Sequence, residues 1–327
     1  MSRLESRPIE VMSFGESLVD FLPNQRGVPL RNVESFRKVV GGAPTNMALG
    51  LARLGRRSAL HGKIGDDEFG RFILETLDAD GVDTRGVIPT SEAKTGLTFV
   101  TLDDGGDRSF LFYRDPSADM LLRPDDVDDS LIAKSQVFQF GSNLLTQPGV
   151  REATYRGLEA AVDADCIISI DPNLRMHLWP DENVVREDVL VLAENADIFK
   201  VNEEELEVLA PGKSGEEAWR QVFEPMGVSV FVVTLGPRGA VAFSATGRAS
   251  AEAPSVAVVD TTGAGDGFMC GLLAGLAPEF ENPDRDSLES ALELGCHVGS
   301  TVCTELGATP PLPYADDLPK HLREVLS

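Results

Sequence analysis

A glycine-rich stretch at residues 260–267, Asp-Thr-Thr-Gly-Ala-Gly-Asp-Gly, holds the residue types best suited to chemistry. It lies between an apolar run at 256–259, which predicts a buried strand, and apolar residues at 268–276 with the spacing of one helix face. A strand-to-helix turn presents backbone N–H groups and the positive end of a helix dipole, so it suits an anion. Gly263 and Gly265 allow the backbone to approach that anion closely.

Asp266 is the unexpected member of this turn, because a carboxylate repels an anion. Its presence is explained if it faces a hydroxyl that attacks a phosphate, since a positioned carboxylate that accepts the hydroxyl proton is part of many phosphoryl-transfer sites. An acidic residue favoured by the helix dipole alone is the alternative. The stretch is not a P-loop, which needs a lysine, nor a dinucleotide fingerprint, whose last glycine is replaced by Phe268.

Polar residues also follow two other predicted strands, where ligands gather in open α/β sheets. Asp20 lies shortly after the strand predicted at 9–14, with a turn-capping role as the alternative. The strand predicted at 166–170 ends in Asp-Pro-Asn-Leu-Arg, whose Arg175 is a candidate for binding a ligand anion or hydroxyl. These positions predict that ligand-binding side chains gather at one edge of the sheet.

Two asparagines begin predicted helices. Asn46 is a polar residue on the first turn of an otherwise apolar helix, and capping competes with ligand binding as its explanation. Asn202 precedes a glutamate-rich helix start in which Glu205 completes a capping box, so a structural role for this pair is strongly favoured.

Strands and helices alternate along most of the chain, which is typical of a parallel sheet covered by helices. The predicted strands are residues 9–14, 58–64, 137–140, 166–170, 198–201 and 228–235, the last pairing with 240–244, and the predicted helices are residues 47–54, 68–77, 149–162, 188–195, 268–276 and 287–301. Two β-prone runs at 95–102 and 109–114 flank Asp103–Asp107 and predict a hairpin. Together with the turn-rich segment 21–39, this hairpin is expected to form a lid.

The chain is strongly acidic. Its 327 residues carry 29 Lys and Arg against 53 Asp and Glu, a formal charge of −24. Such a surface repels nucleic acid and anionic membranes, so neither is an expected partner. It also repels free ATP, so a nucleotide site would need a local positive field and Mg²⁺. No apolar run approaches a membrane span and the start has no signal segment, so we expect a cytoplasmic protein.

The two glycine-rich motifs resemble the signatures of the ribokinase-like (PfkB) carbohydrate kinases. Residues 260–267 are similar to the C-terminal signature, and residues 41–46, Gly-Gly-Ala-Pro-Thr-Asn, with Gly55 and Gly65 downstream, to the N-terminal one. The resemblance covers residues 9–315. Fructokinase is the branch that looks most similar, through residues 65–70, 113–122, 171–175 and 178–180.

This resemblance implies an α/β fold, a three-layer α/β/α sandwich with a small β-sheet lid. The whole chain, 1–327, would be one kinase domain with lid segments at about 18–39 and 95–120. The implied reaction is ATP-dependent phosphorylation of a sugar hydroxyl, with D-fructose converted to fructose 6-phosphate. Mg²⁺ and a monovalent cation, K⁺, would assist, and the lids of two subunits would pair in a homodimer.

The resemblance also implies a role for each candidate residue. Asp266 would be the base, and the N–H groups of Gly263, Ala264, Gly265 and Asp266 the anion hole. The sugar would be bound by Asp20, Gly41, Gly42, Asn46, Asn173 and Arg175. ATP would contact Asn202, Thr234, Gly236, Gly239, Gly263 and Gly265. Glu205 would act on Mg²⁺ through water, and the monovalent cation would lie near Asp260 and Thr262 and loop carbonyls at Ser300 and Gly307.

The sequence leaves several alternatives to this function. A 2-keto-3-deoxygluconate kinase binds a carboxylate, so Arg175 would need a second cation such as Arg108 or Arg114; ribose and nucleoside kinases come next. A non-catalytic sugar or nucleotide sensor belongs to another class, and the intact Asp266 disfavours it because a sensor needs no base. A Rossmann oxidoreductase is disfavoured by the failed dinucleotide fingerprint.

Overall fold

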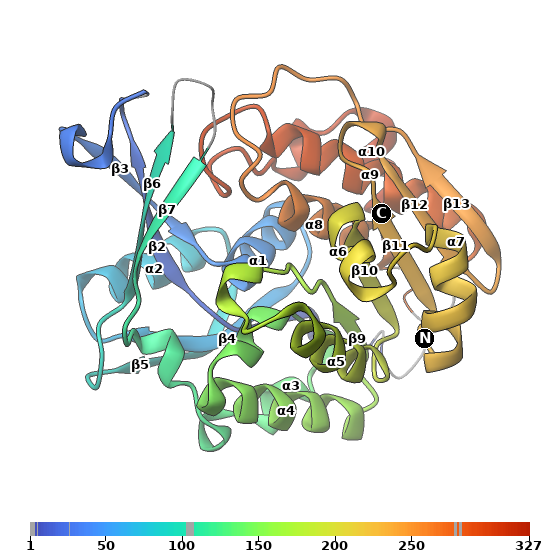
Figure 1. Ribbon diagram of the computed structural model, residues 1–327, viewed down its shortest axis with the longest axis horizontal. Coiled ribbons are helices and arrows are strands. Elements are labelled where there is room, and N and C mark those ends of the chain that lie inside the picture. Colours follow the sequence, from blue (N-terminus) through green and yellow to red (C-terminus); the bar gives the residue numbers. More distant parts are fainter. Residues whose placement is uncertain (1–3, 5, 26, 103–107, 278–279, 281–282) are drawn as a thin grey trace.

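The computed structural model describes residues 4, 6–25, 27–102, 108–277, 280 and 283–327. In this part of the chain a nine-stranded sheet has the order β13-β12-β11-β10-β9-β8-β1-β4-β5, and a four-stranded sheet has the order β3-β2-β6-β7 (Figure 1). The large sheet consists of β1 (Ile9–Phe14), β4 (Ser58–Gly65), β5 (Asp83–Thr90), β8 (Ser135–Phe140), β9 (Ile167–Ile170), β10 (Ile198–Asn202), β11 (Val230–Thr234), β12 (Ala240–Ser244) and β13 (Gly247–Ala251).

In the large sheet, neighbouring strands pair in parallel from β5 at one edge through β4, β1, β8, β9 and β10 to β11. Strands β12 and β13 then extend the sheet in antiparallel fashion. The inner strands are continuous apolar runs such as Val-Phe-Val-Val in β11, because a parallel sheet is buried on both faces. Parallel strands direct their carboxyl ends to one edge, and the residues predicted to bind ligands follow β9, β10 and β11 there.

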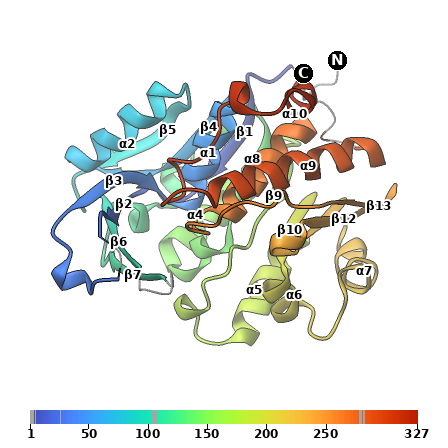
Figure 2. The ribbon, with the colours of Figure 1, turned by 90° about the horizontal axis from the view of Figure 1, so that it is seen from above.

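Helices cover both faces of the large sheet (Figure 2). One hydrophobic core lies between the sheet and α1 (Ala43–Arg53), α2 (Glu68–Ala79), α8 (Ala264–Leu276), α9 (Arg285–Val302) and α10 (Lys320–Val325). A second core lies between the opposite face and α3 (Asp129–Ile132), α4 (Pro148–Asp163), α5 (Glu182–Ala193), α6 (Glu203–Leu209) and α7 (Gly215–Ala218). The predicted three-layer α/β/α sandwich is confirmed.

Helix α8 is held tightly against α9. Its glycines remove the side chains that would separate the two backbones: a β-carbon on Gly271 would lie 2.6 Å from the Leu294 carbonyl oxygen, and one on Gly275 2.7 Å from the Ala291 Cα. The start of α8, which carries the predicted anion-binding turn, is therefore fixed by a buried helix pair.

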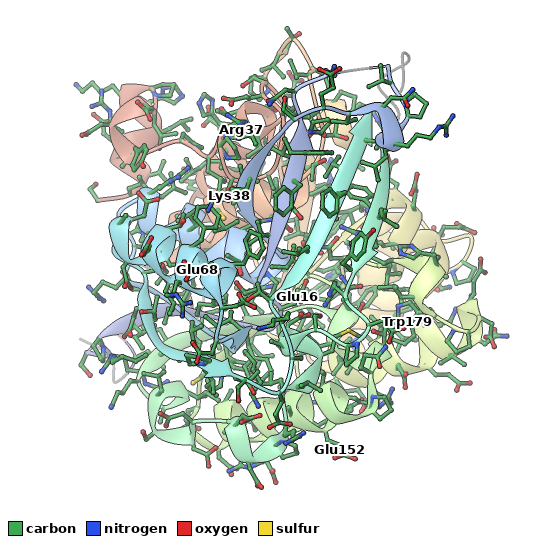
Figure 3. All side chains as sticks on the ribbon, turned by 90° about the vertical axis from the view of Figure 1, so that its left-hand side faces the viewer. Glu16, Arg37, Lys38, Glu68, Glu152 and Trp179 are labelled. Atoms are coloured by element: carbon green, nitrogen blue, oxygen red, sulfur yellow. The ribbon has the colours of Figure 1, made fainter. Side chains whose placement is uncertain are left out.

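The small sheet consists of β2 (Leu18–Pro23), β3 (Phe36–Gly41), β6 (Gly96–Leu102) and β7 (Arg108–Tyr113), and it projects from one end of the sandwich. Strands β6 and β7 pair antiparallel, which confirms the predicted hairpin, and its predicted turn at 103–107 lies outside the described residues. Two side chains of β3 join this sheet to the body: Arg37 donates to Glu305 at 3.0 Å, and the Lys38 Nζ lies 3.8 Å from the centre of the Phe72 ring (Figure 3).

The prediction of a buried strand at 256–259 is wrong. This segment belongs to neither sheet, with Val258 64% exposed and the Val259 N–H donating to the Cys303 carbonyl oxygen at 2.8 Å. Four apolar residues in a row are compatible with a segment that belongs to no sheet as well as with a strand. The composition of this run therefore misled the prediction. The prediction also missed β5 and β13, edge strands that carry polar residues, glycine and, in β5, proline.

Helix α5 begins at Glu182, six residues before the predicted start. The side chain of Asp181 caps it by accepting from the N–H groups of Asn183 and Val184. No helix among the described residues is long and apolar enough to cross a membrane.

Candidate active site

The turn that precedes α8 depends on Gly263. This residue has a φ of 77°, in the left-handed region, and stands at the N-terminus of the helix that begins at Ala264. A β-carbon on Gly263 would lie 2.4 Å from the Cβ of Ala308. Both the backbone conformation and the packing therefore require glycine.

The first hydrogen bond of the α8 ladder joins the Gly267 N–H to the Gly263 carbonyl oxygen, at 2.7 Å. The Ala264 N–H donates to a carbonyl in the preceding turn, at 3.2 Å. The amides of Gly265 and Asp266 lie before the ladder, so their N–H groups are among those that a helix leaves for ligands. Of the four residues predicted to form the anion hole, Gly265 and Asp266 have the amides that are best placed to donate to a ligand.

The Asp266 carboxylate is buried at the start of α8 and held from two sides. The Asn46 Nδ2 donates to its Oδ2 at 2.8 Å, and the Asn173 Nδ2 approaches its Oδ1 at 3.4 Å. Burial raises the pKa of Asp266 above its ordinary value, Asn46 opposes this rise, and the nearby charge of Asp171 adds to it. The carboxylate is thus oriented and made more basic, which suits a proton acceptor.

A cavity of about 880 Å³ opens in front of this carboxylate, between the edge of the large sheet and the small sheet. It is large enough for a nucleotide and a second small ligand. Of the predicted site residues, those that line it are Asp20, Gly42, Asn46, Asn173, Arg175, Asn202, Glu205, Thr234, Gly236, Thr262, Gly263, Gly265 and Asp266. Those that do not are Gly41, Gly239, Asp260, Ala264, Ser300 and Gly307.

Gly41 and Gly239 act through packing. A β-carbon on Gly41 would lie 2.3 Å from an Asp20 carboxylate oxygen, so this glycine makes room for Asp20. A β-carbon on Gly239 would lie 2.0 Å from the Ala251 carbonyl oxygen, so this glycine allows β12 and β13 to pair.

One end of the cavity is acidic. Glu16, in the connection between the two sheets, lies at the base of the small sheet (Figure 3). Burial raises the pKa of Glu16, and burial raises the pKa of Asp20 to about 7, while the Arg114 charge lowers both. Arg114 forms an ion pair with the buried Asp119. This end therefore brings three carboxyl groups around one guanidinium.

Asn143 joins the same end from a short 3-10 turn at Ser142–Thr146. Its Oδ1 is buried without a hydrogen-bond partner in the described part of the structure, as is the Oδ1 of Asn46. A buried acceptor without a partner costs free energy, so both oxygens are suited to receive a ligand hydroxyl.

A buried ion pair lies below the turn. The Lys200 Nζ donates to the Asp171 Oδ2 at 2.9 Å, and both side chains are less than a tenth exposed. Next to it, Asn202 and Glu205 form the predicted capping box of α6, which confirms the structural role of this pair. The other oxygen of Glu205 accepts from the Leu174 N–H at 2.8 Å.

The residues predicted around a monovalent cation are only partly brought together. The buried Asp260 carboxylate accepts from the Thr262 N–H at 2.9 Å and the Gly307 N–H at 2.8 Å. Ser300, however, lies in the last turn of α9 and not in a loop, and its carbonyl accepts from the Cys303 N–H.

Three site residues were missed from the sequence. Lys200 had a signal, since a lysine inside the apolar strand Ile-Phe-Lys-Val is unusual unless its charge is used. Glu16 follows β1 as Asp20 does, and the strand-end rule that selected Asp20 applies to it equally. Asn143 had no signal, because only the fold brings its turn to the cavity.

The chain was compared with known proteins. The pattern of the family described as "pfkB family carbohydrate kinase" matches residues 8–315. The Arabidopsis thaliana protein named "Probable fructokinase-6, chloroplastic" is 41% identical over 307 residues, which are 93% of this chain and 79% of that protein. Two solved structures are similar to this chain. The fructokinase of Xylella fastidiosa with bound ATP has a TM-score of 0.84 and 33% identity, and the match covers 97% of each chain. A fructokinase double mutant of Vibrio cholerae O395, in a form with fructose, ADP and potassium ion bound, has a TM-score of 0.82 and 31% identity, and the match covers 94% of this chain and 96% of that chain.

Proposed function

Because this chain belongs to the pfkB family of carbohydrate kinases, we propose that it transfers the γ-phosphate of ATP to the 6-hydroxyl of D-fructose. The observation that carries the proposal is the Asp266 carboxylate, which is buried beside the Gly263 turn, held by Asn46 and part of the cavity wall. Relatives named fructokinases support the choice of sugar.

In the proposed reaction, the Asp266 carboxylate accepts the proton of the sugar 6-hydroxyl. The oxygen then forms a bond to the γ-phosphorus while the bond from that phosphorus to the β–γ bridging oxygen breaks, leaving ADP. The transferring group keeps its negative charge on the equatorial oxygens of a loose transition state. The amides of Gly265 and Asp266 are placed to donate to those oxygens, and fixed donors of this kind stabilise developing charge without reorganisation.

The acidic end of the cavity supports a neutral, hydroxyl-rich substrate. Asp20 and Glu16 supply carboxyl oxygens for sugar hydroxyls, and the unpartnered Oδ1 of Asn143 adds an acceptor. A substrate carboxylate, as in 2-keto-3-deoxygluconate, would approach these acidic groups while Arg114 is already paired with Asp119. The arrangement therefore favours fructose over the keto-acid.

The arginines that could bind the carboxylate of a keto-acid do not reverse this preference for fructose. Arg175 is exposed and donates to carbonyls of its own loop, at 3.2 and 3.4 Å. The side chain of Arg108 lies outside the described part of the structure.

The other end of the cavity is proposed to hold ATP. Asn202, Thr234 and Gly236 line it at the ends of β10 and β11, and ligands bind beyond strand ends in sheets of this type. The similar Xylella fastidiosa structure contains ATP. Gly239 is not proposed to contact ATP directly, because it packs against β13.

Mg²⁺ is proposed to arrive with the nucleotide, since no group of three potential metal-binding His, Cys, Asp or Glu residues is present in the described parts of the chain. Both Glu205 oxygens already accept backbone N–H bonds, so its influence on Mg²⁺ would pass through water. For K⁺, Asp260 and Thr262 supply a buried carboxylate and a hydroxyl that are hydrogen-bonded to each other, and the Gly307 N–H donates to the same carboxylate. Ser300 fits less well because its carbonyl belongs to a helix turn. The potassium-bound Vibrio cholerae structure supports the choice of K⁺ as the cation.

The small sheet is proposed to act as a lid within a single kinase domain. The cavity lies between this sheet and the body, with Asp20, Thr98, Phe110 and Phe112 of the sheet among its walls. The family match across residues 8–315 supports one domain. The cytoplasmic location stays a prediction, since one relative is named as chloroplastic.

A homodimer through the lids is also proposed. Side chains of β7 alternate, so Phe110 and Phe112 face the cavity while Leu111 and Tyr113, 44% and 61% exposed, lie on the outer face. Strand β7 is an edge of its sheet, and an exposed apolar edge is suited to a second subunit.

Light scattering tests this homodimer. The wild type is expected at about twice the chain mass, and a Leu111→Asp/Tyr113→Asp variant near the chain mass, because two charges would have to be buried in the contact. A wild type that is monomeric across micromolar concentrations would contradict the proposal.

The substrate assignment is tested by ADP release with Mg-ATP and K⁺ in the presence of fructose, 2-keto-3-deoxygluconate, ribose or adenosine. The proposal predicts the highest kcat/KM for fructose. A higher value for another substrate would keep the kinase and overturn the sugar. Tight binding of fructose or ATP without turnover on any substrate would instead favour a sensor.

A further inference from the structure

Lys200 is a buried cation beside the turn that begins α8. The residue is 4% exposed, yet its side chain reaches the wall of the cavity. A β-carbon on Gly265 would lie 3.2 Å from the Lys200 Nζ, which places the ammonium in contact distance of the anion-binding turn. The Asp171 carboxylate, 2.9 Å from the same nitrogen, holds it there.

The other cationic side chains that line the cavity in the described part of the chain are committed elsewhere. Arg114 is paired with Asp119 at the sugar end, and Arg175 is exposed and bonded to its own loop. Lys200 is therefore a buried cation in contact distance of the turn that carries the amides of Gly265 and Asp266.

Lys200 has donors to spare at this position. An ammonium group carries three N–H bonds, and Asp171 accepts one of them in this structure. Burial works against its charge, but Asp171, Glu205 and Asp266 raise the pKa of Lys200, so the group stays protonated. A phosphoryl group entering between these carboxylates meets net negative charge unless this ammonium contacts it directly.

We propose that Lys200 is a catalytic residue whose ammonium donates to an equatorial oxygen of the transferring phosphoryl group, opposite the amides of Gly265 and Asp266. This role rests on the kinase function proposed above. Lys200 keeps its proton throughout: the hydroxyl proton goes to Asp266, the bond between phosphorus and the bridging oxygen breaks, and the bond to the sugar oxygen forms.

A purely structural role is the competing explanation, in which Lys200 only neutralises Asp171. The two explanations differ in a double variant. Lys200→Met/Asp171→Asn removes both charges of the pair, so a merely neutralising lysine would no longer be needed and activity would return. The proposal expects kcat to stay low in this variant although the buried charge imbalance has been relieved.

Lys63→Met is the matched control. Lys63 is also a buried lysine in an ion pair, with its Nζ 2.6 Å from Asp126, and it does not line the cavity. Its substitution is expected to lower stability but to change kcat less than about threefold. Lys200→Met should lower kcat about 10²- to 10³-fold, as the loss of one oxyanion donor does, with KM for the sugar changed less than about threefold.

A binding measurement separates this role from the identity of the sugar. MgADP, aluminium fluoride and the best sugar substrate mimic the transferring group, and calorimetry gives their affinity. Lys200→Met and the double variant should lose at least about tenfold in aluminium fluoride affinity while MgADP binds as in the wild type. Restored kcat in the double variant, or unchanged aluminium fluoride affinity, would overturn the proposal. If another sugar proves to be the substrate, the fructose assignment fails and the same comparison, made with that sugar, still decides the role of Lys200.

Discussion

Asp266 and Asp20 are two carboxyl groups in one cavity whose raised pKa values serve different purposes. Asp266 is buried against two asparagine amides, and its raised pKa makes it a better acceptor for a hydroxyl proton. Asp20 lies at the acidic end, where burial raises its pKa to about 7. In the proposed reaction an ionised Asp20 accepts hydrogen bonds from sugar hydroxyls, so substrate binding would depend on its charge state.

The kcat/KM for fructose is expected to rise with pH up to about 7 and then to level, because the raised pKa leaves Asp20 protonated at lower pH and ionised at higher pH. Asp20→Asn should lower the plateau by about 10- to 100-fold, the loss of a charge-assisted hydrogen bond, and shift the acid limb to the pH range in which Asp266 itself ionises. Stopped-time ADP assays from pH 5.5 to 9 give both profiles. An unchanged acid limb in the variant would contradict the assignment to Asp20.

At the residue scale, the sequence predicted the residues that follow strands or carry glycine-rich turns. Asp266, Asn46 and Asp20 were found in this way, and the structure brings them to one cavity. Asn143 could not be predicted, because its turn is distant in the sequence from Asp20 and Asp266 and only the fold brings it to the cavity. Lys200 could have been predicted, because a charged residue inside an otherwise apolar strand is unusual unless its charge is used.

At the scale of elements, the N-terminus of α8 sets the geometry of the site. Its first turn presents the amides of Gly265 and Asp266, and its buried contact with α9 prevents it from shifting. The conformation at Gly263 joins these two features, because the chain must turn there in the left-handed region while touching Ala308.

Gly263→Ala is expected to cost about 2–5 kcal/mol of unfolding free energy, from the left-handed conformation and from overpacking against Ala308. Gly55→Ala is the control, since Gly55 has a similar φ of 81° with no atom within 4 Å of the added carbon, and it should cost about 1–2 kcal/mol. Urea unfolding and kcat are measured for both. Equal losses of stability, or normal kcat in Gly263→Ala, would contradict this account.

Elements with strong periodicity were predicted well, and the weakest predictions concern edges. The helices at α1, α2 and α4 and the inner strands follow their apolar patterns closely. Strand β13, Gly-Arg-Ala-Ser-Ala, lies at the sheet edge, and its apolar alternation consists of two small alanines only, which is a weak signal for a strand. The run at 256–259 shows the reverse error, in which an apolar segment lies outside any sheet.

At the scale of the whole molecule, a net charge of −24 surrounds a cavity that must admit polyphosphate. Acidic groups also line the cavity, including Glu203 and Glu204 at the end that we propose holds ATP. The alternation of strands and helices predicted the layers, but no pattern in the sequence predicted the size of the cavity or which walls the small sheet contributes.

Thermal stability should rise with salt concentration, because screening weakens the repulsion among surface carboxylates, with a Debye length of about 10 Å at 0.1 M and 3 Å at 1 M. Calorimetry in choline chloride measures screening alone, and the same series in KCl adds any effect of a bound cation. A melting temperature that stays constant or falls between 0.05 and 1 M choline chloride would contradict this expectation.

The most direct test of the central claim is to follow ATP and ¹³C-labelled fructose by ³¹P and ¹³C NMR with the wild type and with Asp266→Asn. The account predicts phosphorus coupling at carbon 6 with the wild type. It predicts a rate about 10²- to 10⁴-fold lower with the variant, which removes the base but keeps an acceptor for Asn46. Phosphate on another hydroxyl, or a variant rate within about tenfold of the wild type, would contradict it.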